Sequence, residues 1–216
     1  MAAIPEARTC TPAPPVRDLM QSRRSIRRYR PTPVARDLLD TVLEAAVAAP
    51  SAHNRQPWRF VVVEATGTKA ALADAMGARL RADRVADGDA IASIDADVAR
   101  SHARLTGAPV LVVVCMTLQD MDRYPDPQRA AAEATMATQS VAMAAQNLMV
   151  CAHSLGLASC WMCAPLFCPD TVASVLGLPS DWNPQGIVTL GHPAEAGKPY
   201  RRHAPTAVVR FADRPA

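Results

Sequence analysis

The stretch that decides the fold is Pro50-Ser51-Ala52-His53-Asn54-Arg55-Gln56-Pro57-Trp58-Arg59-Phe60. It follows a segment with apolar residues at helical spacing, which Pro50 ends, and it leads into Phe60-Val61-Val62-Val63, a run typical of a buried strand. Short polar side chains beside a Pro-Trp pair, placed between two regular elements, are typical of a ligand-facing loop. The stretch therefore predicts a helix, a binding loop and a strand.

A basic block, Arg23-Arg24-Ser25-Ile26-Arg27-Arg28, precedes this stretch, and a second one, Lys198-Pro199-Tyr200-Arg201-Arg202, lies near the other end of the chain. Guanidinium forks together with a hydroxyl suit a phosphate dianion. We therefore expect one anionic ligand held from both ends of the chain. The alternatives are a solvated basic turn for the first block and an exposed basic tail for the second.

Periodicity predicts a mixture of helices and strands without a regular βαβ alternation, which favours the α+β class. Helices are expected over residues 16–22, 35–49, 68–86, 89–106, 128–154 and 169–176, and strands over 59–64, 110–115, 186–191 and 206–211. Residues 120–126 and 156–164 are expected to form loops. The helix over 128–154 turns apolar nearly all round, so we expect a partner subunit to cover part of it.

The composition limits the kinds of protein that this chain can be. The chain has 216 residues, of which 50% are apolar and 20% charged, and this predicts a globular fold. We expect a flexible Pro-rich arm over 1–17 and a single domain over 18–216. A net charge of +3 does not favour a nucleic-acid partner, and no apolar run reaches the ~20 residues of a membrane helix. The six Cys residues and the absence of a signal-like opening predict reduced thiols in the cytoplasm.

Four motifs in order resemble the nitroreductase superfamily of FMN-dependent oxidoreductases, over residues 18–211. They are Arg-Arg-Ser-x-Arg from Arg23, the Pro50–Trp58 block, Gln146-Asn147-Leu148 and Gly156–Met162. The resemblance implies a three-layer fold, with a central mixed or antiparallel sheet flanked by helices and a long buried central helix. It implies an intertwined homodimer with two FMN sites at its interface. It also implies ping-pong hydride transfer from NAD(P)H, or from a reduced deazaflavin, to a small planar acceptor such as a nitroarene, quinone or enone.

The resemblance assigns residues to the cofactor and leaves the hydride chemistry to the flavin, so no catalytic side chain is expected. The first basic block and the late Arg pair are expected at the phosphate and ribityl chain, the 50–56 loop beside the ring, and the backbone N–H groups near Cys163 at flavin N5. The cofactor-binding set is Arg23, Arg24, Ser25, Arg27, Pro50, Ser51, Ala52, His53, Asn54, Gln56, Cys160, Trp161, Met162, Cys163, Ala164, Arg201 and Arg202. Tyr124 and Phe167 are expected to roof the substrate site.

Several alternatives stay open. The stretch from Ala108-Pro109 to Met136, with Ser159–Met162, is similar to the branch containing the C-terminal reductase domain of the bifunctional enzyme that builds coenzyme F-420. This similarity makes a dehydro precursor of that coenzyme a candidate substrate. A non-catalytic flavin-binding protein and a flavin-cleaving enzyme are further alternatives.

A metal site is the rival interpretation of the Cys residues. Cys160-x-x-Cys163, with Cys151 and Cys168 nearby, could ligate zinc or an iron–sulfur cluster, or Cys160 and Cys163 could form a redox disulfide. A closed zinc site usually uses two paired knuckles, and here the second knuckle is missing. We therefore expect no metal.

Overall fold

The structure is a computed structural model, and it describes residues 15–212. The helices are α1 (Val16–Ser22), α2 (Arg36–Val47), α3 (Thr66–Ala86), α4 (Ile91–Thr106), α5 (Pro127–Ser154), α6 (Pro169–Leu176) and α7 (Pro205–Val208). The strands are β1 (Trp58–Val63), β2 (Val110–Met116), β3 (Ala158–Met162) and β4 (Asn183–Gly191), and two 3₁₀ turns are η1 (Ala52–Asn54) and η2 (Ala164–Phe167). Of the predicted arm, residues 1–14 lie outside the described residues, whereas Val16 and Arg17 belong to α1.

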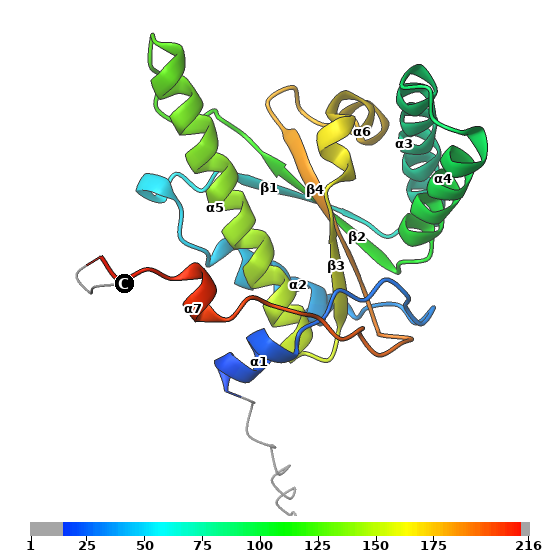
Figure 1. Cartoon of the computed structure of the whole chain (residues 1–216), viewed down its shortest axis with the longest axis horizontal. Helices are drawn as coiled ribbons and strands as arrows, with labels where there is room; N and C mark the ends of the chain where they lie inside the picture. The colour runs from blue at the N-terminus through cyan, green and yellow to red at the C-terminus, as the bar shows by residue number, and fades with distance from the viewer. Residues whose placement is uncertain (1–14, 213–216) are drawn as a thin grey trace, which may run out of the picture.

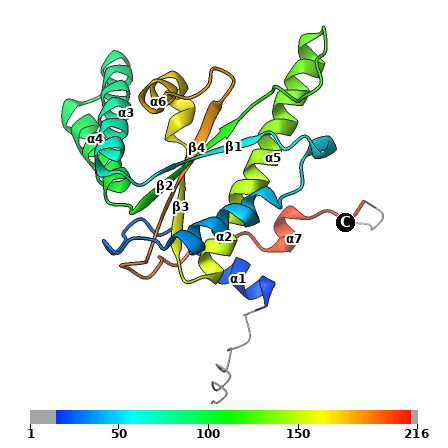
Figure 2. The same cartoon turned by 180° about the vertical axis from the view of Figure 1, so that it is seen from behind.

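The strands form one antiparallel sheet in the order β1-β2-β4-β3. Helices α2 and α5 cover one face, and α3, α4 and α6 lie on the other (Figures 1 and 2). Strand β2 is buried along its whole length, because alternate valines face opposite layers. The predicted α+β class with a central sheet flanked by helices is confirmed, and the sheet is antiparallel throughout.

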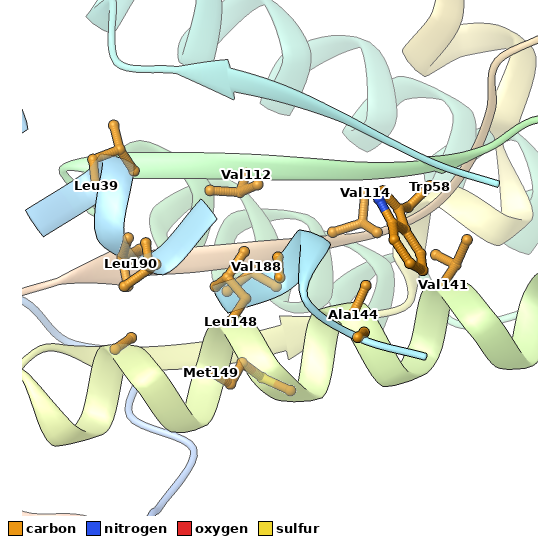
Figure 3. Close-up of a cluster of buried hydrophobic side chains, with 14 of the residues drawn as sticks. Leu39, Trp58, Val112, Val114, Val141, Ala144, Leu148, Met149, Val188 and Leu190 are labelled. Carbon is orange, nitrogen blue, oxygen red and sulfur yellow. The ribbon is translucent and has the colours of Figure 1, made fainter. Parts of the chain in front are cut away.

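The larger core lies between the sheet and α5 (Figure 3). Val112 and Val188 from the sheet pack against Leu148 of α5, and Trp58 packs in the same cluster as Val141. Each of these side chains is at most 5% exposed. This packing fixes α5 across the sheet, and it thereby fixes the loops at both ends of the helix.

Helix α5 is covered on one side only within a single chain. Its N-cap is Asp126, whose carboxylate accepts a hydrogen bond from the Arg129 amide at 2.9 Å. Met143 is 38% exposed, whereas Leu148 is fully buried. Although α5 has 28 residues, none of the helices within residues 15–212 is long and apolar enough to span a bilayer.

Two predicted elements were wrong. Residues 206–211 form no strand, because Pro205 opens the short helix α7 and this segment pairs with none of the four strands. Residues 158–162, expected to lie in a loop, form β3, because they pair with β4 from Ala158↔Gly191 to Met162↔Ile187. The other elements lie where the periodicity places them, with ends shifted by three residues or fewer.

Candidate functional site

The basic block near the N-terminus lies along the edge strand β3. Ser25 forms an isolated parallel bridge with Ser159, and the Ile26 amide donates to the Ser159 carbonyl at 3.2 Å. The Tyr29 hydroxyl donates to the Ile26 carbonyl at 2.6 Å and lies 2.7 Å from the Thr189 hydroxyl of β4. Burial raises the pKa of this phenol, so the hydroxyl stays protonated and its hydrogen bonds join the basic block to β4. The block is therefore fixed in an extended conformation beside the sheet.

The chain after β4 returns to the same block. The Ala194 amide donates to the Arg28 carbonyl at 3.1 Å, and the Tyr200 hydroxyl donates to the Gln21 carbonyl at 2.9 Å. Two guanidinium groups stack on the Tyr200 ring, Arg24 at 4.0 Å and Arg202 at 4.2 Å from its centroid. Cationic side chains from both ends of the sequence therefore meet at one place. The Arg201 side chain forms no hydrogen bond or ion pair within residues 15–212.

Gly197 permits this close approach. A Cβ atom on Gly197 would lie 2.2 Å from the Cβ atom of Arg24, far inside van der Waals contact. Any larger residue at this position would push the returning chain away from the basic block.

A cavity of about 360 Å³ opens beside the block. Its lining includes five cationic residues and one acidic residue: Arg27, Arg28, Arg100, Arg104, Lys198 and Glu195. Such an excess of positive charge suits an anionic ligand. Two residues of this lining, Arg100 and Arg104 of α4, were not predicted from the sequence. Their spacing of four places them on one helix face, but only the packing of α4 brings that face to the block.

Arg23 provides the clearest sign of a missing partner. Its Nη1 atom is buried and has no hydrogen-bond partner among residues 15–212. A buried donor without an acceptor is costly, and a phosphate oxygen would satisfy it. Arg23 also acts on two neighbours. The pKa of His153 is lowered by burial and then by Arg23 and Arg24, and the pKa of Cys160 is raised by burial but lowered by Arg27, Arg104 and Arg23.

The 50–56 loop has a strained backbone. His53, Asn54 and Gln56 have φ angles of 49°, 54° and 50°, in the left-handed region that non-glycine residues seldom adopt. Hydroxyl groups hold it there, since the Ser51 hydroxyl accepts from the Gln56 amide at 3.0 Å and Ser140 of α5 accepts from the Ala52 amide at 3.2 Å. Such strain persists where surrounding contacts enforce it, often at functional sites.

Within one chain this loop lies far from the basic block. The loop contacts α5 at Ser140, whereas Ser22, next to the block, lies 2.8 Å from the ring nitrogen of His153 on the same helix. Ser140 and His153 are thirteen positions apart along α5, or ~20 Å. The predicted flavin residues therefore form two separate groups in the single chain.

Strand β3 leads from the basic block toward Cys163. Cys163 lies four positions after Ser159, directly after the end of β3, a distance of ~13 Å if the chain is extended. The Trp161 indole donates to the Cys163 sulfur at 3.0 Å, and its ring lies against Gly186 of β4, where a Cβ atom would come within 2.3 Å of it. Cys163 and Ala164 thus begin η2 at a position fixed by Trp161.

The model of the Nitroreductase family matches residues 20–192. The chain belongs to this family. It is similar to an NADH dehydrogenase of Thermus thermophilus, with 35% identity over 83% of this chain and 87% of that protein. It is also similar to a 5,6-dimethylbenzimidazole synthase of Rhodospirillum rubrum, with 30% identity over 82% of this chain and 81% of that protein. A nitroreductase structure from Desulfovibrio desulfuricans in complex with FMN matches with a TM-score of 0.69 and 25% identity, over 94% of this chain and 98% of that one.

The predicted superfamily is thereby confirmed, whereas the comparisons single out no F-420 branch within it.

The two expected roof residues of this nitroreductase-family chain lie apart. Tyr124 lines a cavity of about 820 Å³, with the Arg129 guanidinium 4.7 Å from its ring centroid. Phe167 is 75% exposed and lines a different cavity, of about 280 Å³.

The four cysteines of the rival metal site each have a different neighbour in this family member. Cys160 and Cys163 are free thiols, and Cys160 faces its own strand's carbonyl while Cys163 accepts from Trp161. Cys151 and Cys168 each lie near a different backbone carbonyl, of Thr41 and Ala164 respectively. Over residues 15–212, no three potential ligand side chains gather into a metal site.

Proposed function

We propose that this protein is an FMN-dependent oxidoreductase of nitroreductase type. It transfers hydride from NAD(P)H, or from a reduced deazaflavin, to a small planar acceptor such as a nitroarene, quinone or enone. The observation that carries the proposal is the buried Nη1 atom of Arg23, which has no hydrogen-bond partner within residues 15–212 and belongs to the basic block of a Nitroreductase-family chain. FMN, when bound, supplies the hydride chemistry.

The chain's own residues bind and orient the cofactor. Arg23, Ser25 and Arg27 hold the phosphate and ribityl end, with Arg202 on Tyr200 enclosing this end from the C-terminal segment. The ~13 Å from Ser159 to Cys163 matches an extended mononucleotide, with the ring at Cys163 and Ala164. The cationic side chains of the cavity keep the potential positive at the phosphate end of the cofactor.

The site is completed by a second subunit in a homodimer. The strained 50–56 loop lies ~20 Å along α5 from the basic block of its own chain, so it serves the cofactor of the partner. Apolar side chains that are exposed in the single chain provide an interface: Val16, Met20, Val47, Met143 and Leu155. The five free thiols within residues 15–212 fit a reducing, cytoplasmic location.

The first experiment measures the cofactor. The protein is purified without added flavin, its visible spectrum is recorded, and FMN is titrated by fluorescence quenching. Arg23→Met should weaken FMN binding about tenfold or more, since a charge-assisted hydrogen bond contributes ~1.5–3 kcal/mol. Arg36→Met is the matched control, because Arg36 is an exposed residue of α2 paired with Asp40. A protein that takes up no FMN contradicts the proposal.

Turnover separates the enzyme from a flavin-binding protein without activity. NADH and NADPH oxidation is followed with a quinone or nitroarene acceptor, and parallel lines in double-reciprocal plots are expected for a ping-pong reaction. If FMN binds but neither donor supports turnover, the alternative of a non-catalytic flavin-binding protein is the one that remains. The narrower F-420 alternative is tested by offering the dehydro precursor as acceptor.

The dimer is tested by Met143→Arg, which places a charge on the exposed face of α5. We expect sedimentation equilibrium to give a monomer with lost FMN affinity, because the partner's loop is then absent. Ala71→Arg, at an exposed position of α3 on the other face of the sheet, is the control for the added charge. A monomeric wild-type protein that binds FMN tightly contradicts the shared site.

A second candidate is formation of 5,6-dimethylbenzimidazole from the flavin, favoured by the 30% identity to the Rhodospirillum rubrum synthase. The protein is incubated with reduced FMN and oxygen, and the products are examined by mass spectrometry. Appearance of this base would establish the second candidate in place of the first.

A further inference from the structure

The cavity of about 280 Å³ at Phe167 opens between α3, α4 and the turn η2, which joins β3 to α6 (Figure 1). Its uncharged lining is mostly apolar and comes from all three elements and from the residue after η2: Met76, Leu80, Ser101, Ala164, Phe167 and Cys168. Since sites for drug-sized molecules usually measure ~300–1,000 Å³, this cavity suits a small ring system.

Ala164 connects this cavity with the proposed flavin site. The proposed function places the flavin ring at Cys163 and Ala164, and Ala164 is also part of the cavity lining. The cavity of about 820 Å³ at Tyr124, by contrast, contains none of the residues expected at the ring. Of the two cavities with an expected roof residue, the one at Phe167 is therefore the one that adjoins the ring within a single chain.

Phe167 is held at the edge of this cavity by a fixed turn. Pro165 and Cys168, on either side of it in the sequence, are buried. The Cys168 amide donates to the Pro165 carbonyl at 3.1 Å, and the Cys168 thiol donates to the Ala164 carbonyl at 3.5 Å. Phe167 itself remains 75% exposed. An aromatic side chain fixed at the edge of an apolar cavity offers a flat ligand a surface for stacking.

The charged part of the lining has no net charge, since it consists of two arginines and two aspartates: Arg79, Arg84, Asp83 and Asp87. Arg79 donates to both carboxylate oxygens of Asp83, at 2.8 and 2.9 Å. Arg84 is paired with Asp89 at 2.6 Å and with Asp97. Both arginines are thus already engaged, and Asp87 forms no ion pair within residues 15–212. An anionic ligand would therefore lose its hydration here without gaining a cation.

We propose that this cavity binds the ring of a neutral, flat aromatic acceptor, and that Phe167 is a specificity-determining residue. The ring stacks on Phe167, and its apolar edge lies against Met76 and Leu80. Since this site rests on the proposed oxidoreductase function, it narrows the range of acceptors. Uncharged quinones and nitroarenes bind, whereas their anionic derivatives are disfavoured.

The test is calorimetric titration of the oxidised, FMN-saturated protein with menadione, a neutral naphthoquinone. No electron donor is present, so binding is measured without turnover. Phe167→Ala should weaken menadione binding about three- to tenfold, the range expected for one aromatic pair. Leu166→Ala is the matched control and should bind as the wild type does, because Leu166 is a 52% exposed residue of η2 outside the cavity lining. Equal affinities of Phe167→Ala and the wild type would overturn the proposal.

A charged competitor tests the selectivity. 1,4-Naphthoquinone-2-sulfonate has the same ring system with one negative charge, and competition registers only binding at the menadione site. The sulfonate should displace menadione at least about tenfold less effectively than neutral 1,4-naphthoquinone does. Equal displacement by the two compounds would overturn the assignment, because the absence of a spare cation would then play no part in recognition.

Ser101→Phe gives a second readout. It fills the cavity from α4 and should abolish menadione binding in a protein that still folds and retains FMN. Unchanged menadione binding in that variant would overturn the assignment. So would a monomeric Phe167→Ala protein in sedimentation equilibrium, since the ring would then belong to the subunit contact. A wild-type protein that takes up no FMN is instead a failure of the proposed function, whereas FMN uptake with menadione binding that neither variant changes is a failure of this site alone.

Discussion

Replacement of Gly186 by Ala tests how the edge strand β3 is positioned. Gly186 lies on β4, and an added Cβ atom would lie 2.3, 2.5 and 2.7 Å from three atoms of the Trp161 ring. Unstrained contacts between carbon atoms lie near 3.5–4 Å, so the ring would have to move by ~1 Å or more. This displacement would break the 3.0 Å hydrogen bond from the Trp161 indole to Cys163.

We expect Gly186→Ala to lower the free energy of unfolding by about 1–3 kcal/mol, the usual cost of overpacking. For a chain of this length, each kcal/mol lowers the Tm by about 2–4 °C. The assay is thermal and urea unfolding followed by far-UV circular dichroism, with the Trp fluorescence recorded on the same samples. Gly67→Ala is the control, because nothing lies within 4 Å of a Cβ atom on that helical residue.

A double-mutant cycle isolates the cause. In a Trp161→Leu background the ring is gone, so Gly186→Ala should then cost less, with a coupling of about 1 kcal/mol or more. The same cost in both backgrounds would refute the steric argument. So would a Gly186→Ala protein that is as stable as the wild type while its Trp161 fluorescence is unchanged.

Two further predictions concern titratable groups: His153, beside the basic block, and the thiols of Cys163 and Cys115. Burial, then Arg23 and Arg24, lower the pKa of His153, so the folded state disfavours its protonation. The contribution of His153 to the free energy of unfolding should be complete above about pH 6.5, the ordinary pKa of histidine, and should be lost as the pH falls below it. His153→Gln should remove this pH dependence. If FMN phosphate lies at Arg23, saturation with FMN should raise the pKa of His153 in an NMR titration of its imidazole, and an unchanged titration curve would place the phosphate elsewhere. Burial raises the pKa of Cys115 to about 12, whereas Cys163 is exposed, so a thiol reagent at pH 8 should modify Cys163 rapidly and Cys115 only on unfolding. FMN should slow the Cys163 reaction, and the Cys163→Ser variant should lose one fast-reacting thiol. A Cys163→Ser variant with as many fast-reacting thiols as the wild type would contradict this.

Strong local signals made much of the fold predictable. Two examples are the β-branched run over 110–115 and the apolar repeat of α2. Each element is specified by residues that are neighbours in sequence, so the local pattern is enough to predict it. The C-terminal segment misled because Val208 and Val209 favour a strand. A strand also needs a neighbour, and Pro205 together with the missing partner gives a short helix instead.

The site was less predictable, because it depends on long-range packing. The five residues of β3 become a strand only through pairing with β4, a relation that no local pattern carries. Arg100 and Arg104 join the basic cavity because the packing of α4 brings them to the block, and their sequence neighbourhood contains no phosphate motif. Arg27, by contrast, was found because its motif is contiguous.

The separation of the two predicted motifs argues for a cofactor shared between chains. A loop with three non-glycine residues in the left-handed region is costly to maintain, at about 1–3 kcal/mol for each such residue. Its own chain offers that loop no ligand, since the basic block lies ~20 Å away along α5. The same helix leaves Met143 exposed between the two contacts, one turn after Ser140. A second copy packed on that face would bring its strained loop toward the first chain's basic block. The strain and the exposed apolar face would then have a single explanation. A dimeric protein in which Asn54→Ala leaves FMN affinity unchanged would remove that explanation.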